Sequence, residues 1–239
     1  MKLCLIPLKT KQRDPQVNLE RLRNRLEEAS HFQPDLICLP ECTLTGYLYE
    51  QEDIRYFAQP AKGPTMQKMA ELACSFHVSL CYGFLESAPE GIYNSATLLD
   101  KNGDVLHTHR KVVEKMPFVC GQPFKSIDTG FGRLGIVICG DLFEGEPEKY
   151  FEDTSLVLMP MSRCFDGLSP DPERWQREER QVYLDAVRAL GIPTAIVNTL
   201  DDNAGETSFG GALMVDGKGK LLAESPHGSD ELLIWEMTL

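Results

Sequence analysis

The segment Phe131-Gly-Arg-Leu-Gly-Ile-Val-Ile-Cys139-Gly-Asp141 is the strongest indication of how this chain folds. Its apolar run, 134–138, is typical of a buried strand. The run ends at a cysteine, which is followed at once by Gly140 and Asp141. A thiol at the exit of a buried strand, next to a small residue that leaves backbone N–H groups accessible, is arranged as a nucleophile. Cys139 is therefore the first candidate catalytic residue.

Two other expected strands also end in a reactive side chain. Leu36-Ile-Cys-Leu-Pro-Glu41 ends in a carboxylate, and His107-Thr-His-Arg-Lys111 ends in an ammonium group. In open α/β sheets, groups at the carboxyl ends of strands converge on one crevice. We therefore expect Glu41, Lys111 and Cys139 to meet there as a base, a cation and a thiol.

The rest of the chain alternates between expected helices and strands. Helices are predicted at 16–30, from Pro64 onward and at 172–190, and the polar stretch 50–62 carries no predicted element. Asn102-Gly103 predicts a hairpin turn. This pattern indicates an α/β fold with a mixed sheet covered by helices, in one domain spanning 1–239. Strands are predicted at 3–8, 36–39, 78–84, 93–99, 104–109, 134–138, 155–159, 194–198, 209–215, 221–224 and 231–235.

Composition and charge exclude several classes of protein. The chain has 239 residues, of which 42% are hydrophobic and 25% charged, as in ordinary globular proteins. A net charge of -12 disfavours nonspecific binding to nucleic acid or to an anionic membrane. No apolar run approaches the roughly 18 residues of a membrane-spanning helix, and the apolar N-terminus is too short for a signal peptide. The eight cysteines form no C-x-x-C pair; we expect reduced thiols and a cytoplasmic location.

Three motifs in this order resemble those of the nitrilase, or carbon–nitrogen hydrolase, superfamily. Leu39-Pro-Glu41 with Thr45-Gly-Tyr47 resembles the glutamate motif of the family, and Arg110-Lys111 resembles its lysine motif. The stretch ending in Cys139-Gly-Asp141 resembles its nucleophile motif. The resemblance runs from Met1 to about Trp235. It implies a four-layer αββα sandwich, a homodimer as the common assembly, and hydrolysis of non-peptide C–N bonds without a metal or cofactor.

The chemistry of these residue types agrees with the resemblance. Cys139 would attack an amide carbonyl and form a thioester, while Glu41 moves the protons, which requires a pKa raised by burial. Lys111 and the N–H of Gly140 would stabilise the oxyanion, a contact worth roughly 3 to 4 kcal/mol. The predicted substrate is a small linear amide or carbamoyl compound. Nitrile hydrolysis and acyl transfer use the same residues and stay open as alternatives.

Three further residues are predicted to complete the site. Members of the family often carry a second glutamate four residues before an aromatic residue, and Glu114 lies four residues before Phe118. The segment between Lys111 and Glu114 is, however, shorter than the corresponding loop of the family. Gly140 stands where relatives often carry a bulkier residue, so we expect a larger pocket beside the nucleophile. Arg163 follows the next strand, where it would either bind a substrate carboxylate in bidentate fashion or be a solvated loop residue.

The sequence is also compatible with two other functions. A papain-like Cys–His pair would use His107 or His109, which lie on the same side of an expected strand as Lys111. Geometry leaves that pair open, but the sequence lacks the Cys–His signatures. A noncatalytic homologue that acts as a binding or assembly module is the second alternative, and the intact glutamate, lysine and cysteine argue against it.

A metal or nucleotide site is not predicted. Cys38, Cys42 and His31 match none of the common zinc-ligand spacings, and apolar residues surround both thiols. The glycines at Gly210-Gly211 and near Asp216 are better explained by turns, because no G-x-G-x-x-G or Walker pattern occurs. The expected partner is a small-molecule substrate alone.

Overall fold

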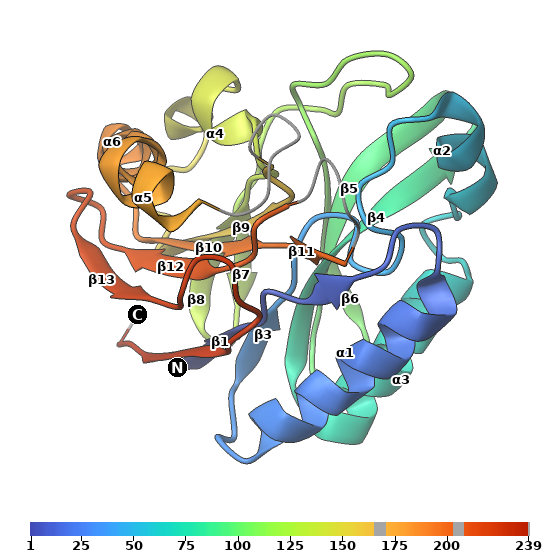
Figure 1. The fold of residues 1–239 in the computed structure, drawn as a ribbon, viewed down its shortest axis with the longest axis horizontal. Coiled ribbons are helices and arrows are strands. Elements are labelled where there is room, and N and C mark those ends of the chain that lie inside the picture. Colours follow the sequence, from blue (N-terminus) through green and yellow to red (C-terminus); the bar gives the residue numbers. More distant parts are fainter. Residues whose placement is uncertain (165–170, 203–207, 239) are drawn as a thin grey trace.

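Two six-stranded sheets lie face to face at the centre of the molecule (Figure 1). The computed structural model describes residues 1–164, 171–202 and 208–238. The first sheet has the order β14-β1-β3-β4-β5-β6 and the second the order β13-β12-β10-β9-β8-β7, while β2 pairs with β11. The strands are β1 (Lys2–Leu5), β2 (Lys9–Thr10), β3 (Leu36–Cys38), β4 (Ser79–Ala88), β5 (Gly91–Leu99), β6 (Val105–Arg110), β7 (Ile127–Thr129), β8 (Gly132–Ile136), β9 (Leu156–Met161), β10 (Thr194–Asn198), β11 (Leu200–Asp201), β12 (Ala212–Val215), β13 (Leu221–Glu224) and β14 (Leu233–Glu236).

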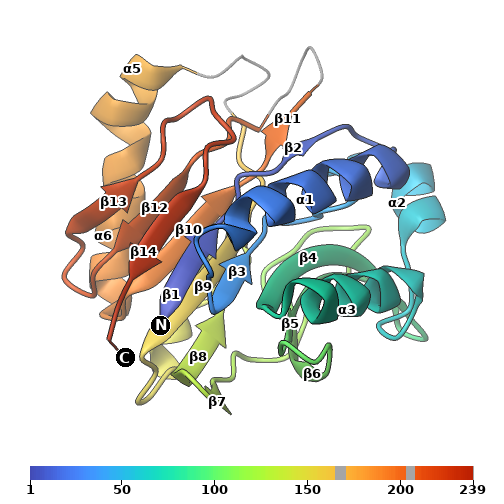
Figure 2. The ribbon, with the colours of Figure 1, turned by 90° about the horizontal axis from the view of Figure 1, so that it is seen from below.

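Helices cover the outer faces of both sheets. Figure 2 shows α1 and α3 on one side of the strands and α6 on the other. The helices are α1 (Pro15–Ser30), α2 (Gln51–Phe57), α3 (Pro64–Phe76), α4 (Asp141–Glu144), α5 (Pro172–Arg174) and α6 (Arg180–Leu190), with a π-helical turn (Trp175–Glu179) between α5 and α6 and a 3-10 turn at Pro147–Lys149. The resulting layers are helix, sheet, sheet and helix, which confirms the predicted αββα sandwich. Among the described residues, no helix has the length and apolar character needed to span a membrane.

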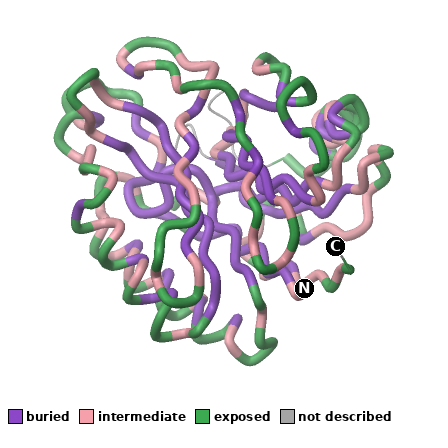
Figure 3. The backbone as a smooth tube through the Cα atoms, turned by 180° about the vertical axis from the view of Figure 1, so that it is seen from behind, coloured by how far each residue is buried: buried purple, intermediate pink, exposed green. Residues whose placement is uncertain are grey.

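The alternation of side chains along each strand divides the core into layers. Leu3 and Leu5 of β1 pack between the two sheets, whereas Cys4 packs toward the α1 and α3 layer. On β9, Leu158 packs between the sheets and Met159 toward α6. Strands buried on both faces have nearly continuous apolar sequences, and each fully buried leucine stabilises the fold by about 1.5 to 3 kcal/mol. In Figure 3 the buried segments, in purple, lie mainly at the centre of the molecule, and the exposed segments, in green, lie mainly around the outside.

Helix α1 illustrates how the sequence forms its covering layer. Asp14 caps the helix by accepting a hydrogen bond from the backbone N–H of Val17 at 3.2 Å, and Pro15 occupies the first turn, where its missing N–H costs nothing. Leu22 and Leu26 lie on one face of the helix and are buried against the first sheet. The predicted helix therefore forms because its N-terminal cap and its apolar face both favour a helix over these residues.

The observed elements follow the prediction closely, with a few differences. The predicted strands at 194–198 and 221–224 have the observed bounds. The first strand ends at Leu5, earlier than predicted. Helix α2 lies in the polar stretch, and only Ile54 of its side chains is buried, so the sequence shows no apolar periodicity there. The long helix at 172–190 is interrupted by the π-helical turn, and β7 was not predicted.

Candidate active site

Three strand exits bring the predicted catalytic side chains into one cluster. Glu41 follows β3 and Lys111 follows β6, so both come from the first sheet, whereas Cys139 follows β8 of the second sheet. The Lys111 Nζ atom lies 3.3 Å from Glu41 Oε1. The charges of Glu41 and Lys111 both act on the Cys139 thiol. The convergence predicted from strand ends is therefore present, and it occurs across two sheets.

The turn that carries Glu41 packs closely against the backbone of β4. The next residue, Cys42, has a φ of 51°, a left-handed conformation. Gly83 of β4 lies directly against this turn, and a Cβ atom there would be 2.7 Å from the Glu41 Cα atom. The N–H of Thr43 donates to the Gly83 carbonyl at 2.9 Å. Glycine is required at position 83 because a side chain would push the turn away from the sheet.

The segment after Lys111 closes back on itself. The Lys111 N–H donates to the Asn94 carbonyl at 2.8 Å, and the Gly121 N–H donates to the Lys111 carbonyl at 2.7 Å. A Cβ atom at Gly121 would lie 2.1 Å from the Arg110 carbonyl oxygen. The shortened loop, 111–121, therefore depends on a glycine at its base, and its closure fixes the backbone of the lysine.

The turn that carries the thiol has an unusual backbone conformation. Cys139 has a φ of 46°, although it has a side chain, and it remains partly exposed between two buried segments. Its N–H donates to the Pro160 carbonyl at 3.1 Å, and the N–H of Ser162 donates to its sulfur. The backbone at the carboxyl end of β9, together with the residue that follows this strand, thus holds Cys139 at its N–H and at its sulfur.

Two carboxylates and an amide surround the lysine. Glu41 is 1% exposed and Lys111 is 7% exposed. Lys111 Nζ donates to Glu114 Oε1 at 2.7 Å. The Asn94 side chain donates to Glu41 Oε1 at 2.6 Å and to Glu114 Oε1 at 3.1 Å. The structure therefore places the predicted second glutamate inside the cluster despite the short loop.

The protonation states of the cluster suit a base beside a neutral thiol. Burial raises the pKa of Glu41, although the charge of Lys111 and the Asn94 hydrogen bond oppose this. Its Oε2 atom is buried and has no hydrogen-bond partner among the described residues, so it is positioned to accept a proton. Burial raises the pKa of the Cys139 thiol to about 12, with a further rise from Glu41 and an opposing effect of Lys111. A thiol with this pKa needs a base in order to react at neutral pH.

The lysine is held in its charged form. Burial acts to lower the pKa of Lys111, but the negative charges of Glu41, Cys139 and Glu114 outweigh burial and raise it. A permanently charged ammonium in a mostly buried site is suited to stabilising an anion that develops during a reaction.

Arg163 also lies near the nucleophile. Its backbone is fixed by Asn198, whose side-chain oxygen accepts from the Arg163 N–H at 2.8 Å. Its guanidinium lies 3.5 Å from Glu179 Oε1. The charge of Arg163 acts to lower the pKa of Cys139. Arg163 is thus a partly exposed residue that pairs with Glu179, and its binding of a substrate carboxylate stays a prediction.

A pocket of about 260 Å³ opens beside Gly140 and Glu114. Tyr47, Tyr49 and Phe118 also line it. A Cβ atom built at Gly140 would meet no described heavy atom within 4 Å. Glycine therefore leaves room at the position that follows the nucleophile, and a role in substrate binding stays a prediction.

From the sequence, Asn94 falls in an expected strand and Asp141 in the nucleophile motif, but neither has a predicted role. Asp141 is fully buried, and its Oδ2 atom lies 3.1 Å from His109 Nε2. This contact engages His109 away from the thiol and gives the papain-like hypothesis no support. For Asp141 the sequence did contain a signal, because this carboxylate lies in a segment expected to be buried. A buried carboxylate requires hydrogen-bond donors.

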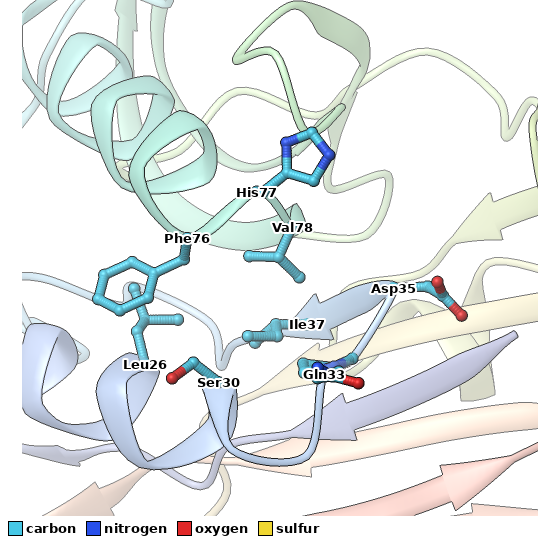
Figure 4. Close-up of a pocket in the computed structure, with 9 residues that line it drawn as sticks. Leu26, Ser30, Gln33, Asp35, Ile37, Phe76, His77 and Val78 are labelled. Atoms are coloured by element: carbon cyan, nitrogen blue, oxygen red, sulfur yellow. The ribbon is translucent and has the colours of Figure 1, made fainter.

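The pocket in Figure 4 lies at the opposite end of β3 from Glu41. Its volume is about 380 Å³, and it lies between the C-terminal ends of α1 and α3. The side chains of Leu26, Ile37, Phe76 and Val78 form an apolar floor in this pocket. Its lining contains none of the predicted site residues.

The cysteines and histidine considered as metal ligands lie apart. Cys38 is in the core between the sheets, Cys42 is in a separate buried cluster, and His31 is exposed. No group of three His, Cys, Asp or Glu side chains that could hold a metal ion occurs within 1–164, 171–202 and 208–238.

Comparison with known proteins identifies relatives along almost the whole chain. The family model described as carbon-nitrogen hydrolase matches residues 3–239. The "Probable nitrilase C965.09" of Schizosaccharomyces pombe is 30% identical over 84% of this chain and 84% of its own. The "Omega-amidase NIT3" of Saccharomyces cerevisiae is 25% identical, covering 96% of this chain and 84% of its own. These matches confirm the resemblance found in the sequence and the prediction of an amidase-like carbon–nitrogen hydrolase.

A solved structure with the same fold supports the architecture. The amidase from Nesterenkonia sp. superimposes with a TM-score of 0.82 at 23% identity, covering 100% of this chain and 90% of its own. For a variant of that amidase, covalent addition of the acetamide moiety of fluoroacetamide at the active site cysteine has been described. At this level of identity the likeness establishes the fold.

Proposed function

Because this chain belongs to the carbon–nitrogen hydrolase family, we propose that it hydrolyses a small linear amide or carbamoyl compound with Cys139 as nucleophile. The observation that carries this assignment is the buried cluster beside Cys139, in which Lys111 contacts Glu41 at 3.3 Å and Glu114 at 2.7 Å. Burying three charged groups costs free energy that a purely structural site would avoid. Perturbed pKa values are concentrated at functional sites for the same reason.

The first half of the reaction forms a thioester. Glu41 removes the Cys139 proton as the sulfur attacks the carbonyl carbon, and the carbonyl oxygen becomes an oxyanion. Lys111 and the N–H of Gly140 stabilise this oxyanion. Glu41 then returns the proton to the nitrogen, the C–N bond breaks, and ammonia or an amine leaves. The buried Glu41 Oε2 atom, which accepts no hydrogen bond from the described residues, is the site for this proton.

The second half of the reaction consumes water. Glu41 takes a proton from water, the resulting hydroxide attacks the thioester, and Lys111 again stabilises the oxyanion. The C–S bond breaks, and Cys139 regains a proton from Glu41. The net reaction of an amide with water gives a carboxylic acid and ammonia or an amine. No metal or cofactor takes part in these steps.

Glu114 is proposed to keep Lys111 charged and oriented, since the two side chains that donate to its Oε1 atom, Lys111 and Asn94, also contact Glu41. Glu114→Gln removes this charge but keeps the shape of the side chain. We expect kcat to fall by about tenfold, as the loss of one charge-assisted hydrogen bond implies. Unchanged turnover in Glu114→Gln, alongside loss of turnover in Glu41→Gln, would remove Glu114 from the mechanism.

Gly140 and Arg163 are proposed to contact the substrate. Support for Gly140 comes from the open space around its Cα atom and from its place in the pocket wall. Arg163 lies near the thiol, and a carboxylate on the substrate would compete with Glu179 for its guanidinium. A substrate that pairs with Arg163 would bind less tightly to Arg163→Gln, which is measured as a raised KM.

The substrate class is tested by a panel of amides. Relatives bear the names omega-amidase and citrullinase, and a third bears the name probable nitrilase. The panel therefore contains ω-amides, aliphatic amides, N-carbamoyl amino acids and nitriles, and ammonia release is measured for wild type and Cys139→Ala. We expect release from an amide or carbamoyl compound that disappears in the variant. Release that persists in Cys139→Ala would exclude the thiol mechanism, and release from neither protein would favour the noncatalytic alternative.

Assembly and location are also proposals. The family resemblance supports a homodimer, which light scattering would test directly. All eight cysteines lie in the described part of the chain and are unpaired, in keeping with a reducing cytoplasm. The core shared by the two sheets supports one domain across 1–239, and limited proteolysis that yields no stable fragment would agree with it.

A further inference from the structure

Asp141 connects the two segments that carry the lysine and the thiol. Its Oδ1 atom accepts hydrogen bonds from the backbone N–H groups of Val112 and Val113 at 3.0 and 2.9 Å. Its Oδ2 atom lies 3.1 Å from His109 Nε2 and accepts from the Ile138 N–H at 3.3 Å. The carboxylate is fully buried, so these four donors replace the water that would otherwise solvate its charge.

The donors to Asp141 come from the segments that carry Lys111 and Cys139. Val112 and Val113 directly follow Lys111, whereas Ile138 directly precedes Cys139. The lysine segment leaves the first sheet and the thiol segment leaves the second. One carboxylate therefore fixes the backbone of two reactive residues that come from different sheets.

A purely local role for Asp141 does not explain these contacts. Asp141 is the first residue of α4, a helix of four residues, where an acidic side chain would interact with N–H groups of its own helix. Three of its four donors instead come from residues 109–113. We propose that Asp141 is a positioning residue for the hydrolysis, which presupposes the function proposed above. It sets the separation between the Lys111 ammonium and the Cys139 sulfur.

His109 takes part in the same arrangement. For both side chains to be satisfied, its Nε2 atom must carry a proton and donate it to Asp141. The imidazole is 4% exposed and stacks on Phe124 with ring centroids 5.2 Å apart. His109 therefore holds the Asp141 carboxylate in the orientation that leaves Oδ1 for the two backbone donors.

The first variant to test is Asp141→Asn. An asparagine offers one acceptor oxygen and one NH₂ group, so in either orientation the NH₂ group faces a backbone N–H of Ile138 or of Val112 and Val113. We expect kcat to fall by about 100-fold with KM changed less than about threefold, because a displacement of about 1 Å is enough for such a loss. Asp128→Asn is the control, since Asp128 has a side chain 90% exposed on β7, and we expect no change.

A second measurement does not need a substrate. Iodoacetamide transfers its carboxamidomethyl group to a thiolate with loss of iodide, and mass spectrometry of the Cys139 peptide gives the rate at each pH. In wild type the Lys111 charge acts to lower the pKa of Cys139. Displacement of the lysine removes this effect, so in Asp141→Asn the alkylation of Cys139 should slow and shift to higher pH. The exposed Cys74, on α3, is an internal reference whose rate should not change.

His109→Gln keeps the experiment decisive if Asp141→Asn does not fold. It removes one of the four contacts, and we expect about tenfold lower kcat and a smaller shift of the alkylation profile. His107→Gln is the matched control, two residues earlier on the same strand and outside the contacts of Asp141. Unchanged kcat and unchanged alkylation in a folded Asp141→Asn or His109→Gln would overturn the positioning role. Turnover that survives in Cys139→Ala would instead overturn the proposed function, whatever the result for Asp141.

Discussion

The two ends of β3 bury very different groups. At its carboxyl end, Glu41 lies in a cluster with Lys111 that is almost closed to solvent. At its amino end, Asp35 lies on the rim of the pocket in Figure 4, where Leu26 and Phe76 form part of an apolar floor. The pocket of about 380 Å³ exceeds the one of about 260 Å³ beside Gly140. Buried charge, which costs free energy to maintain, marks the reactive end more clearly than cavity size does.

The largest expected difference between the two ends comes from changing a carboxylate to an amide at each. Glu41→Gln cannot accept the thiol proton, and we expect kcat/KM to fall by about 10²- to 10⁴-fold. Asp35→Asn, at the amino end of the same strand, should leave kcat/KM within about twofold. Amide hydrolysis by the two purified variants tests this directly. Equal losses in both would mean that the contrast between the ends is not functional.

The next effect concerns the buried cation. Lys111→Met keeps much of the side-chain length but removes the charge that faces the oxyanion, so we expect kcat to fall by about 10²- to 10³-fold. Lys101, in the turn near the opposite end, provides the control as Lys101→Met, which should leave kcat unchanged. Steady-state kinetics of both variants give the comparison. If Lys111→Met raised only KM, the lysine would bind the ground state and the transition state equally.

A smaller effect is expected in the pH dependence of stability. Burial raises the pKa of Glu41 in the folded protein, so between its ordinary pKa and this raised pKa the folded state holds more protons than the unfolded state. Stability contributed by this residue is therefore greatest at acidic pH and falls as the pH rises through the raised pKa. Urea titrations at pH 4.5 to 8 give the free energy of unfolding of wild type and of Glu41→Gln. The value for Glu41→Gln minus the value for wild type should increase with pH. A flat or decreasing difference would contradict the raised pKa.

The smallest effect on activity is expected from the opposite pocket. His77 ends α3 in a left-handed conformation, with a φ of 52°. Glycine adopts this conformation without strain, so His77→Gly should raise the free energy of unfolding by up to about 1 kcal/mol. Catalysis should not change, because this pocket contains none of the proposed catalytic residues. A loss of kcat/KM greater than about threefold would show that the two ends are coupled.

Much of the fold was predictable because the core repeats simple patterns. Strands buried on both faces have apolar runs, and α1 has a cap and an apolar face, so their positions followed from local sequence. Helix α2 was missed because Ile54 is its single buried side chain. Such a short helix is stabilised by its surroundings, which local propensity does not report.

The site was predictable to the extent that it depends on strand ends. Glu41, Lys111 and Cys139 each follow a strand in the sequence, so their convergence was expected. The contacts of Asn94 and Asp141 depend on how strands approach one another: Asn94 lies on β5 beside β6, and Asp141 reaches from one sheet to the other. These relations are set by packing over many residues and leave no local pattern to recognise.

Transfer of the acyl group to hydroxylamine shows whether Cys139 carries the covalent intermediate. Hydroxylamine attacks a thioester to give a hydroxamate and releases the cysteine thiol, so it reports the covalent intermediate itself. With the best amide of the panel, we predict that wild type forms hydroxamate and carries the acyl group on the Cys139 peptide after acid quenching, and that Cys139→Ala shows neither. Hydroxamate formed at the same rate by Cys139→Ala, or an acyl group found on another residue, would contradict the assignment of Cys139 as the nucleophile.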